Sequence, residues 1–199
     1  MKYLKDNHVQ HRDLKANNCL VEYEDGLFRV KIADFGLSKS KSLVSKFTRR
    51  SSLNGGTATH MAPEVLRNDT FTEKGDVYSY AIVMYEVLTR LVPYEGLNQP
   101  QIIAQVGAGR RPSPIPEDSP PELVALMKKC WEQEPFVRPD FARILNHLKP
   151  LLPLKAGVQN LPPATRLHTL VSISVSFAPE PLSRALALSL SLFLGPEHE

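Results

Sequence analysis

The chain has 199 residues, of which 42% are hydrophobic and 23% charged, a composition typical of a globular protein rather than of a disordered or fibrous one. The formal net charge of +3 is too small to indicate a nucleic-acid partner, and two cysteines are too few for a disulfide scaffold. We expect an intracellular, cytoplasmic protein without a membrane span, because no stretch reaches roughly 18 apolar residues and the N-terminus lacks a secretory signal.

The first third of the chain predicts one helix end, one hairpin and one loop. Residues 1–6 read as the end of a helix. Residues 20–23 and 27–32 predict two strands of a β-hairpin, joined by the turn that contains Gly26. Residues 37–60 are rich in Ser, Thr, Lys and Arg, which predicts a long exposed loop.

The middle of the chain predicts helices. Apolar residues occur on every face of the segment 76–88, so we expect a central helix that is buried all round. Apolar spacing over 123–131 and over 141–148 predicts two amphipathic helices, the second with Pro139 in its first turn. The expected fold class is therefore mainly α with a small β-hairpin.

The composition changes near Pro150. Residues 150–199 hold only six of the 45 charged residues but seven of the 17 prolines. We therefore expect a folded domain over residues 1–149 and a poorly ordered, Pro/Ser/Leu-rich tail over 150–199.

The strongest chemical signal is the run His-Arg-Asp-Leu-Lys-Ala-Asn-Asn at 11–18. Phosphoryl transfer needs a carboxylate beside the acceptor hydroxyl, a cation near the transferred phosphate and an oxygen ligand for a metal ion. Asp13, Lys15 and Asn18 offer these three groups on one tight loop. The run resembles the catalytic loop of protein kinases, although a chance turn before a strand is the alternative for this loop alone.

A second motif, Asp34-Phe35-Gly36, follows the predicted hairpin. It resembles the magnesium-binding segment of the same family. The resemblance implies that Asp34 bridges the metal to the phosphates, that Phe35 packs under the site, and that Gly36 permits the backbone turn. Phe35 is equally compatible with an ordinary core aromatic residue.

Two further motifs suggest structural contacts. The segment 56–64 resembles the end of the kinase activation loop, which implies that Glu64 pairs with Arg138. Asp76 resembles the helix-start aspartate that hydrogen-bonds the backbone of the catalytic loop. A plain helix-start carboxylate is the alternative for Asp76.

Four motifs in this order give the chain its resemblance to the catalytic lower lobe of a eukaryotic protein kinase, of the serine/threonine type and the tyrosine-kinase-like group. The resemblance implies ATP and Mg²⁺ as cofactors and a protein substrate with a Ser or Thr hydroxyl, with Lys15 and Thr57 beside the acceptor. It implies that Leu20 forms the lower wall of an adenine pocket and that Lys15, Asn18 and Asp34 contact the nucleotide and its metal.

The resemblance also bears on structure and regulation. It assigns structural roles to His11 and Arg12, and it implies that a phosphate on Ser51 or Ser52 pairs with Arg12. The alternative is that both serines are merely solvated. His60 stands where the family usually has an aromatic residue, which suggests a change in how this segment packs.

The sequence departs from the family in one large respect. The upper, N-terminal lobe is absent from it, with the glycine-rich loop and the strand lysine that clamp ATP, and residues 107–112 predict only a loop. We therefore expect this chain alone to bind Mg-ATP weakly and to transfer phosphate near background. Two alternatives remain open: a non-catalytic lobe that binds substrates or a partner kinase lobe, and a truncated gene model.

Overall fold

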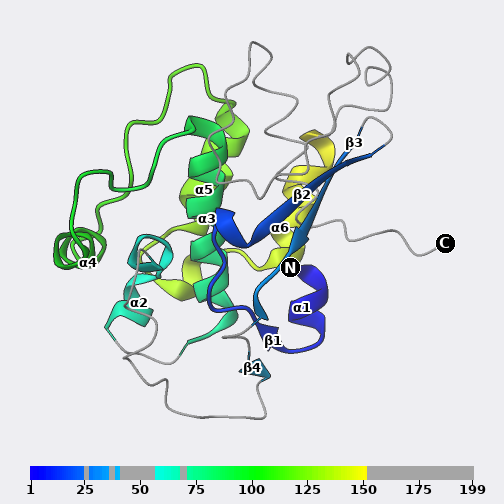
Figure 1. The fold of residues 1–199 in the computed structure, drawn as a ribbon, viewed down its shortest axis with the longest axis horizontal. Coiled ribbons are helices and arrows are strands. Elements are labelled where there is room, and N and C mark those ends of the chain that lie inside the picture. Colours follow the sequence, from blue (N-terminus) through cyan, green and yellow to red (C-terminus); the bar gives the residue numbers. More distant parts are fainter. Residues whose placement is uncertain (25–26, 36–38, 41–56, 68–70, 152–199) are drawn as a thin grey trace.

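The computed structural model describes residues 1–24, 27–35, 39–40, 57–67 and 71–151 (Figure 1). This part of the chain is mostly helical with a small β-hairpin, as the composition and spacing predict, and it has a second small antiparallel sheet that they do not predict. In chain order the helices and strands are α1 (Lys2–Asp6), β1 (Val9–Gln10), β2 (Cys19–Glu24), β3 (Leu27–Ile32), β4 (Lys39–Ser40), α2 (Pro63–Leu66), α3 (Glu73–Thr89), α4 (Gln99–Gly107), α5 (Pro121–Cys130) and α6 (Phe141–Leu148).

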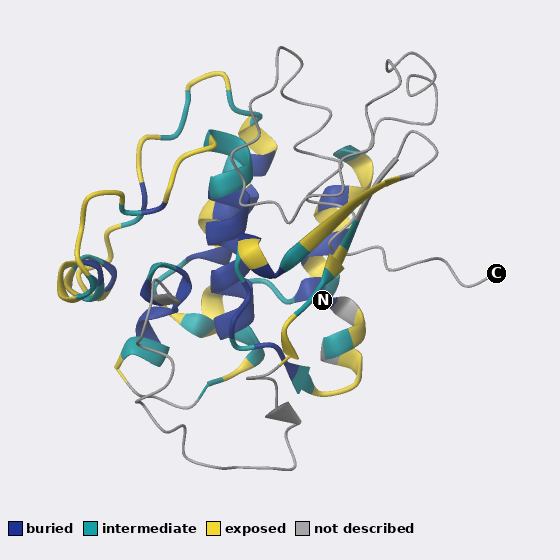
Figure 2. Ribbon diagram, in the orientation of Figure 1, coloured by how far each residue is buried: buried dark blue, intermediate teal, exposed yellow. Residues whose placement is uncertain are grey.

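Helix α3 is the centre of the molecule, and the residues from Gly75 to Tyr85 are all buried (Figure 2). The expected start at Asp76 is wrong by three residues. The side chain of Thr72 accepts a hydrogen bond from the Lys74 amide and caps the helix, so α3 begins at Glu73 and Asp76 lies within its first turn.

Helices α5 and α6 complete the core around α3. The Tyr80 and Phe141 rings meet edge to face at 6.2 Å, and the Tyr85 and Trp131 rings lie 6.5 Å apart. Asp140 caps α6 by accepting a hydrogen bond from a backbone amide three residues on. The expectation that Pro139 lies in the first turn of this helix is therefore wrong, because Pro139 precedes the cap.

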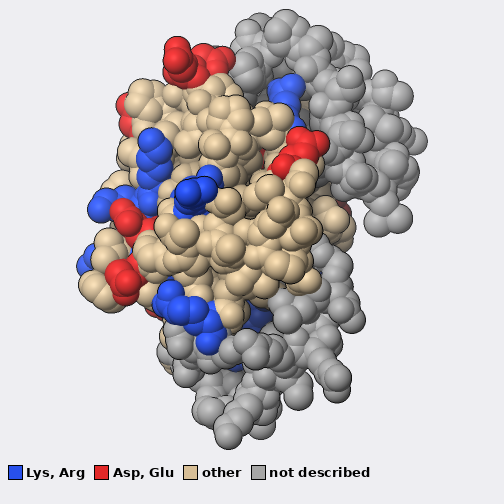
Figure 3. All heavy atoms as spheres, turned by 90° about the vertical axis from the view of Figure 1, so that its left-hand side faces the viewer, with Lys and Arg blue, Asp and Glu red and all other residues tan. Residues whose placement is uncertain are grey.

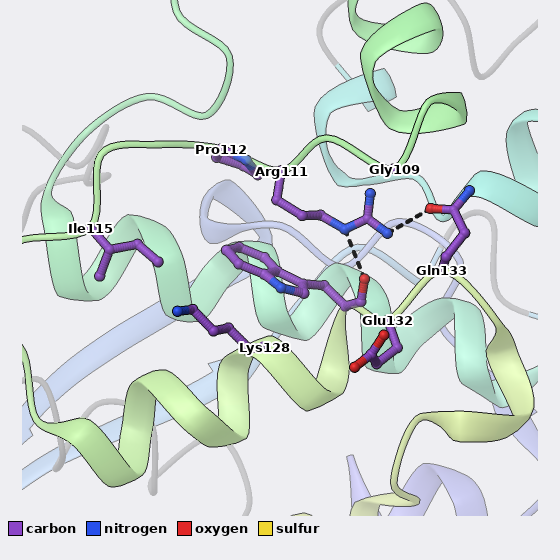
Figure 4. Close-up of a pocket in the computed structure, with 8 residues that line it drawn as sticks. Gly109, Arg111, Pro112, Ile115, Lys128, Glu132 and Gln133 are labelled. Carbon is purple, nitrogen blue, oxygen red and sulfur yellow. Dashed lines mark hydrogen bonds between the residues drawn. The ribbon is translucent and has the colours of Figure 1, made fainter.

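The chain between α4 and α5 is fastened to the end of α5 by one arginine (Figure 4). Arg111 donates from Nε to the Trp131 carbonyl at 2.8 Å and from Nη2 to Gln133 Oε1 at 2.7 Å. Its guanidinium also lies 5.2 Å from the centre of the Tyr78 ring. No residue of the catalytic-loop motif borders the open hollow beside these residues, which is lined by Gly109, Arg111, Pro112, Ile115, Lys128, Trp131, Glu132 and Gln133.

The structure contains one helix that the sequence analysis does not predict, α4. Asn98 and Gln101 form a reciprocal capping box at its start. Only Ile102 and Val106 are buried on it, so its apolar stripe is too narrow to be recognised by spacing alone. On the face where α2 and α4 lie, side chains of both signs are interspersed around a broad uncharged area (Figure 3).

The expected hairpin is present as β2 and β3, in a register that pairs Cys19 with Ile32 and Glu24 with Leu27. A second small sheet pairs β1 with β4. The expectation of an exposed loop over 37–60 is wrong at both ends. Lys39 and Ser40 form β4, and the turn of 3₁₀ helix at Thr57–His60 contains the buried Ala58 and His60.

The structure also bears on two smaller expectations, which concern the cysteines and a membrane span. Cys130 is buried and Cys19 is half-buried, and burial raises the pKa of both thiols to about 12, which fits inert cysteines. Among the described helices, none has both the length and the apolar character that a membrane crossing needs.

Candidate active site

The loop that carries the strongest motif is held by helix α3. The amides of His11 and Arg12 donate to the two carboxylate oxygens of Asp76, each at 2.8 Å. Arg12 has a left-handed backbone with φ of 70°, a strained conformation outside glycine. The two hydrogen bonds therefore hold a shape that the loop would not adopt unaided.

The Asp76 carboxylate is almost completely buried, with 2% of its surface exposed. Burial raises its pKa from the ordinary value of 3.8 to about 6, against the opposing effect of the two amide hydrogen bonds and of the Arg12 guanidinium. Asp76 is thus a buried acceptor that links two parts of the chain 65 and 64 residues apart.

The three groups expected to carry the chemistry lie together on the loop. Lys15 Nζ contacts Asp13 Oδ2 at 2.7 Å. The turn of 3₁₀ helix at Ala16–Asn18 brings Asn18 back toward Asp13, so that its Nδ2 donates to the Asp13 carbonyl at 2.8 Å and to Oδ2 at 3.2 Å. Asp13 is buried, and its other oxygen, Oδ1, has no hydrogen-bond partner among the described residues.

Ala33, the residue before Asp34, holds the Asp-Phe-Gly motif against the loop of residues 11–18. The Ala33 amide donates to the Asn18 carbonyl at 2.8 Å, and the Ala33 carbonyl lies 3.0 Å from Nε2 of His11. Asp34 follows with a left-handed φ of 60°, and it is exposed. The structure therefore gathers Asp34 and Asn18 into one neighbourhood.

His11 is the buried centre of this arrangement. Burial lowers the pKa of its imidazole, so the ring is neutral at pH 7. A proton on Nε2 satisfies the Ala33 carbonyl and leaves Nδ1 to accept from the Asp13 amide at 3.4 Å.

Two apolar side chains expected at the site are only partly covered. The Phe35 ring packs edge-on against His11 at 5.0 Å, but 45% of its surface is exposed, so it is not a residue buried under the site. Leu20 is 48% exposed on β2, so the described residues leave the expected adenine-pocket wall largely open to solvent.

The expected ion pair between Glu64 and Arg138 is present. Arg138 Nη1 and Nη2 donate to the two Glu64 oxygens, each at 2.8 Å, and both side chains are buried. Arg138 also donates to the backbone carbonyls of Glu132, Gln133 and Lys74. The pair therefore joins α2 to the segment before α6.

Some expected site residues lie outside the described part of the chain: Gly36, Ser51 and Ser52. Thr57 begins a described turn of 3₁₀ helix, but its side chain also lies outside what the structure describes.

The sequence did not predict which residues contact His60 and Arg12. Nε2 of His60 lies 3.1 Å from Glu86 Oε2, and the His60 carbonyl accepts from Ser79 Oγ, so α3 anchors this segment. Gln10 and Phe71 surround the side chain of Arg12. A signal for Gln10 was available, since residues two apart on an extended chain share a side.

Comparison with known proteins gives a consistent result. The family model described as protein tyrosine and serine/threonine kinase matches residues 1–148. The probable serine/threonine-protein kinase drkD of Dictyostelium discoideum is 46% identical over 147 residues, which is 73% of this chain and 11% of that protein.

Two other relatives agree. Serine/threonine-protein kinase CTR1 of Arabidopsis thaliana is 41% identical over 154 residues, 76% of this chain and 18% of its own length. Mitogen-activated protein kinase kinase kinase 12 of Rattus norvegicus is 41% identical over 148 residues, 74% of this chain and 16% of its own. The chain thus spans less than a fifth of each of these three proteins.

Proposed function

The chain belongs to the protein tyrosine and serine/threonine kinase family, and from this premise we propose that it carries the acceptor-binding and metal-binding half of an ATP-dependent serine/threonine kinase site. The observation that supports this best is Oδ1 of Asp13, a buried carboxylate oxygen without a partner among the described residues. An unmet buried acceptor costs about 1–3 kcal/mol, so a donor that arrives with the substrate accounts for it.

The loop geometry suits Asp13 to an acceptor hydroxyl. Lys15 and Asn18 hold Oδ2, which fixes the plane of the carboxylate and leaves Oδ1 to accept the hydroxyl hydrogen. An oriented carboxylate positions the attacking oxygen and takes up its proton. Lys15, fixed at 2.7 Å from Asp13, places a positive charge beside the position of the transferred phosphate.

The residues present also fit a magnesium ion. Asn18 uses Nδ2 for Asp13, which leaves its amide oxygen as a ligand atom, and Asp34 adds an exposed carboxylate nearby. Mg²⁺ takes few protein oxygens and completes its shell with phosphates and water, so one carboxylate and one amide oxygen can serve as the protein's ligands. When bound, the metal would neutralise phosphate charge.

We assign the acceptor as Ser or Thr because Lys15 lies beside Asp13 and because the three relatives above include two named as serine/threonine-protein kinases. Thr57 is assigned to the same acceptor site from the motif alone. We assign residues 1–149 to the catalytic lobe and 150–199 to a separate tail.

Phosphate transfer by a completed enzyme tests this proposal. The chain would be joined to an upper lobe that carries a glycine-rich loop and a strand lysine, and labelled γ-phosphate would be followed onto Ser, Thr and Tyr peptides. We expect phosphoserine and phosphothreonine, with a loss of about 10²–10⁴-fold in Asp13→Asn. Asp118→Asn, an exposed aspartate between α4 and α5, is the matched control and should keep full activity.

Two results would contradict the proposal: phosphotyrosine alone, or full activity in Asp13→Asn. A second experiment reads the metal site without turnover. Titrated Mg²⁺ should shift the amide resonances of Asn18 and Asp34, and it should no longer do so in Asp34→Asn.

Regulation is a further part of the proposal. We assign Ser51 and Ser52 as phosphorylation sites whose phosphate pairs with Arg12, because Arg12 is cationic and only half-buried. Mass spectrometry of active protein should find phosphate on one of the two serines, and unmodified active protein would contradict this assignment.

One observation favours a second candidate function, a non-catalytic lobe that binds a partner kinase lobe. Leu20, Val21, Tyr23 and Phe35 are each 39–48% exposed. Large apolar side chains that remain in water mark candidate interaction surfaces. The two functions separate in the same experiment. If the chain binds the upper lobe but the joined protein transfers no phosphate, the result favours the non-catalytic lobe.

A further inference from the structure

Gln10 is a buried polar side chain on the strand that leads into the catalytic loop, with 7% of its surface exposed. Its Oε1 accepts two hydrogen bonds from Arg12, from Nη2 at 2.8 Å and from Nε at 3.2 Å. Its Nε2 lies 3.4 Å from the Phe71 carbonyl, a long contact that fixes which way the amide faces. One amide therefore ties Arg12 to the segment before α3.

The Phe71 ring supports the same guanidinium from one face. The central carbon of the Arg12 guanidinium lies 5.4 Å from the ring centre, within the range of a cation–π contact. The ring lies so close to α3 that a Cβ at Gly75 would be 2.8 Å from it. Gly75 thus makes the space for Phe71, and Phe71 makes the surface for Arg12.

The charge of Arg12 has no ion-pair partner within the described residues. Burial lowers its pKa, and the Asp76 carboxylate, bonded to its amide, opposes that effect. A guanidinium has two edges, and each can bind an oxyanion through two parallel N–H bonds. Here the Nε–Nη2 edge is filled by the neutral oxygen of Gln10 instead.

The side chain of Arg12 is attached to a strained backbone. Its φ is 70°, and the next residue is Asp13. The Asp76 hydrogen bond holds the Arg12 amide, and the Gln10 and Phe71 contacts hold the other end of the same residue. Loosening the side chain removes one of the two restraints on the left-handed turn.

We propose that Gln10 is a positioning residue whose amide oxygen takes the place of an anion at the inner edge of Arg12, and so holds the loop of Asp13 in shape without a phosphate. The inference rests on the proposed function, because it concerns the loop of Asp13, the residue that this function assigns to the acceptor hydroxyl. The other edge of the Arg12 guanidinium, which includes Nη1, stays available for a regulatory phosphate.

Amide hydrogen exchange of His11 and Arg12 in the full chain tests the inference without ATP or substrate. Gln10→Val should speed exchange at these two amides roughly tenfold, because the guanidinium loses its acceptor and the turn opens more often. Gln10→Glu keeps an acceptor oxygen and should exchange as slowly as the unchanged protein. Exchange within α5 and α6 should stay the same in every variant, which shows that each one folds.

Inorganic phosphate provides the second readout. In excess it should slow exchange in Gln10→Val by filling the vacated edge, while sodium chloride of equal ionic strength should not. Gln105→Val is the matched control, since Gln105 on α4 accepts a similar bond from Arg110, and it should leave the His11 and Arg12 amides unchanged.

Three outcomes would overturn the inference: exchange unchanged in Gln10→Val, Gln10→Glu as fast as Gln10→Val, or no effect of phosphate on Gln10→Val. None of these outcomes depends on phosphate transfer. A failure here therefore leaves the proposed kinase function untouched, and an inactive enzyme would leave this measurement valid.

Discussion

The surroundings of α3 and the β2–β3 hairpin distribute polar and apolar groups in opposite ways. Around α3, the charged groups of Asp76, Glu64 and Arg138 are buried and each has its partners inside the protein. On the hairpin, Leu20 and Val21 stay nearly half exposed (Figure 2). Buried charge and exposed large apolar groups are both departures from the usual pattern.

The difference explains where the candidate site is rigid and where it is open. The catalytic loop is fastened to α3 on one side, through the two amides that Asp76 accepts. On its other side the chain passes directly into β2, whose apolar side chains are half in water. The loop is therefore fixed to α3 on one side and continues into a partly exposed strand on the other.

Replacing Arg138 should cause the largest loss of stability in the buried region around α3. Arg138→Met leaves the Glu64 carboxylate buried without its partner, which should lower the free energy of unfolding by about 3–5 kcal/mol. Urea unfolding followed by circular dichroism measures this. Arg143→Met, an exposed arginine on α6, should change stability by about 0.5 kcal/mol or less.

A partner substitution sharpens this prediction. In Glu64→Leu combined with Arg138→Met, the uncompensated charge is gone, so much of the lost stability should return. A loss below about 1 kcal/mol in Arg138→Met would show that the pair contributes little to the fold.

Asp76 should make stability depend on pH. Its pKa in the folded chain, about 6, lies above the ordinary 3.8, so the folded state holds this proton more tightly than the unfolded chain does. Its stabilising contribution is therefore complete below about pH 3.8 and is lost as pH rises to about 6.

The measurement compares the unchanged protein with Asp76→Asn across this pH range. The unfolding free energy of the unchanged protein minus that of Asp76→Asn should fall between pH 3.8 and about 6 and should be level above that. A difference that rises with pH would mean that the carboxylate, rather than the carboxylic acid, is the form favoured by folding.

The smallest effect is expected on the hairpin. Leu20→Ala should cost about 0.5 kcal/mol or less, since half of this side chain already meets water. Leu123→Ala is the matched change in the core, where only 1% is exposed, and it should cost about 2–5 kcal/mol. Similar losses in the two variants would show that the hairpin face is covered in solution.

Local patterns predicted the fold well where one segment decides its own structure. Apolar residues on every face gave α3, and period-3.6 spacing gave α5 and α6 to within two residues. The pattern failed at α4, because a capping box and two buried side chains decide that helix. It also failed at the start of α3, where the Thr72 cap was not recognised.

The candidate site was likewise predictable where its residues lie on one short segment. Motif spacing was enough to single out Asp13, Lys15 and Asn18, because they lie on one short loop and contact one another. The environment of Arg12 could not be predicted, because the Phe71 surface comes from a segment 59 residues away in the chain.

The buried polar contacts around α3 span long stretches of chain, and this has a consequence for synthesis. Asp76 follows His11 by 65 residues, and Arg138 follows Glu64 by 74. Translation at about 5–20 residues per second delivers these partners several seconds after the groups they bind. The loop at 11–18 is thus synthesised before the start of α3, and its backbone can settle only once the start of α3 has left the ribosome.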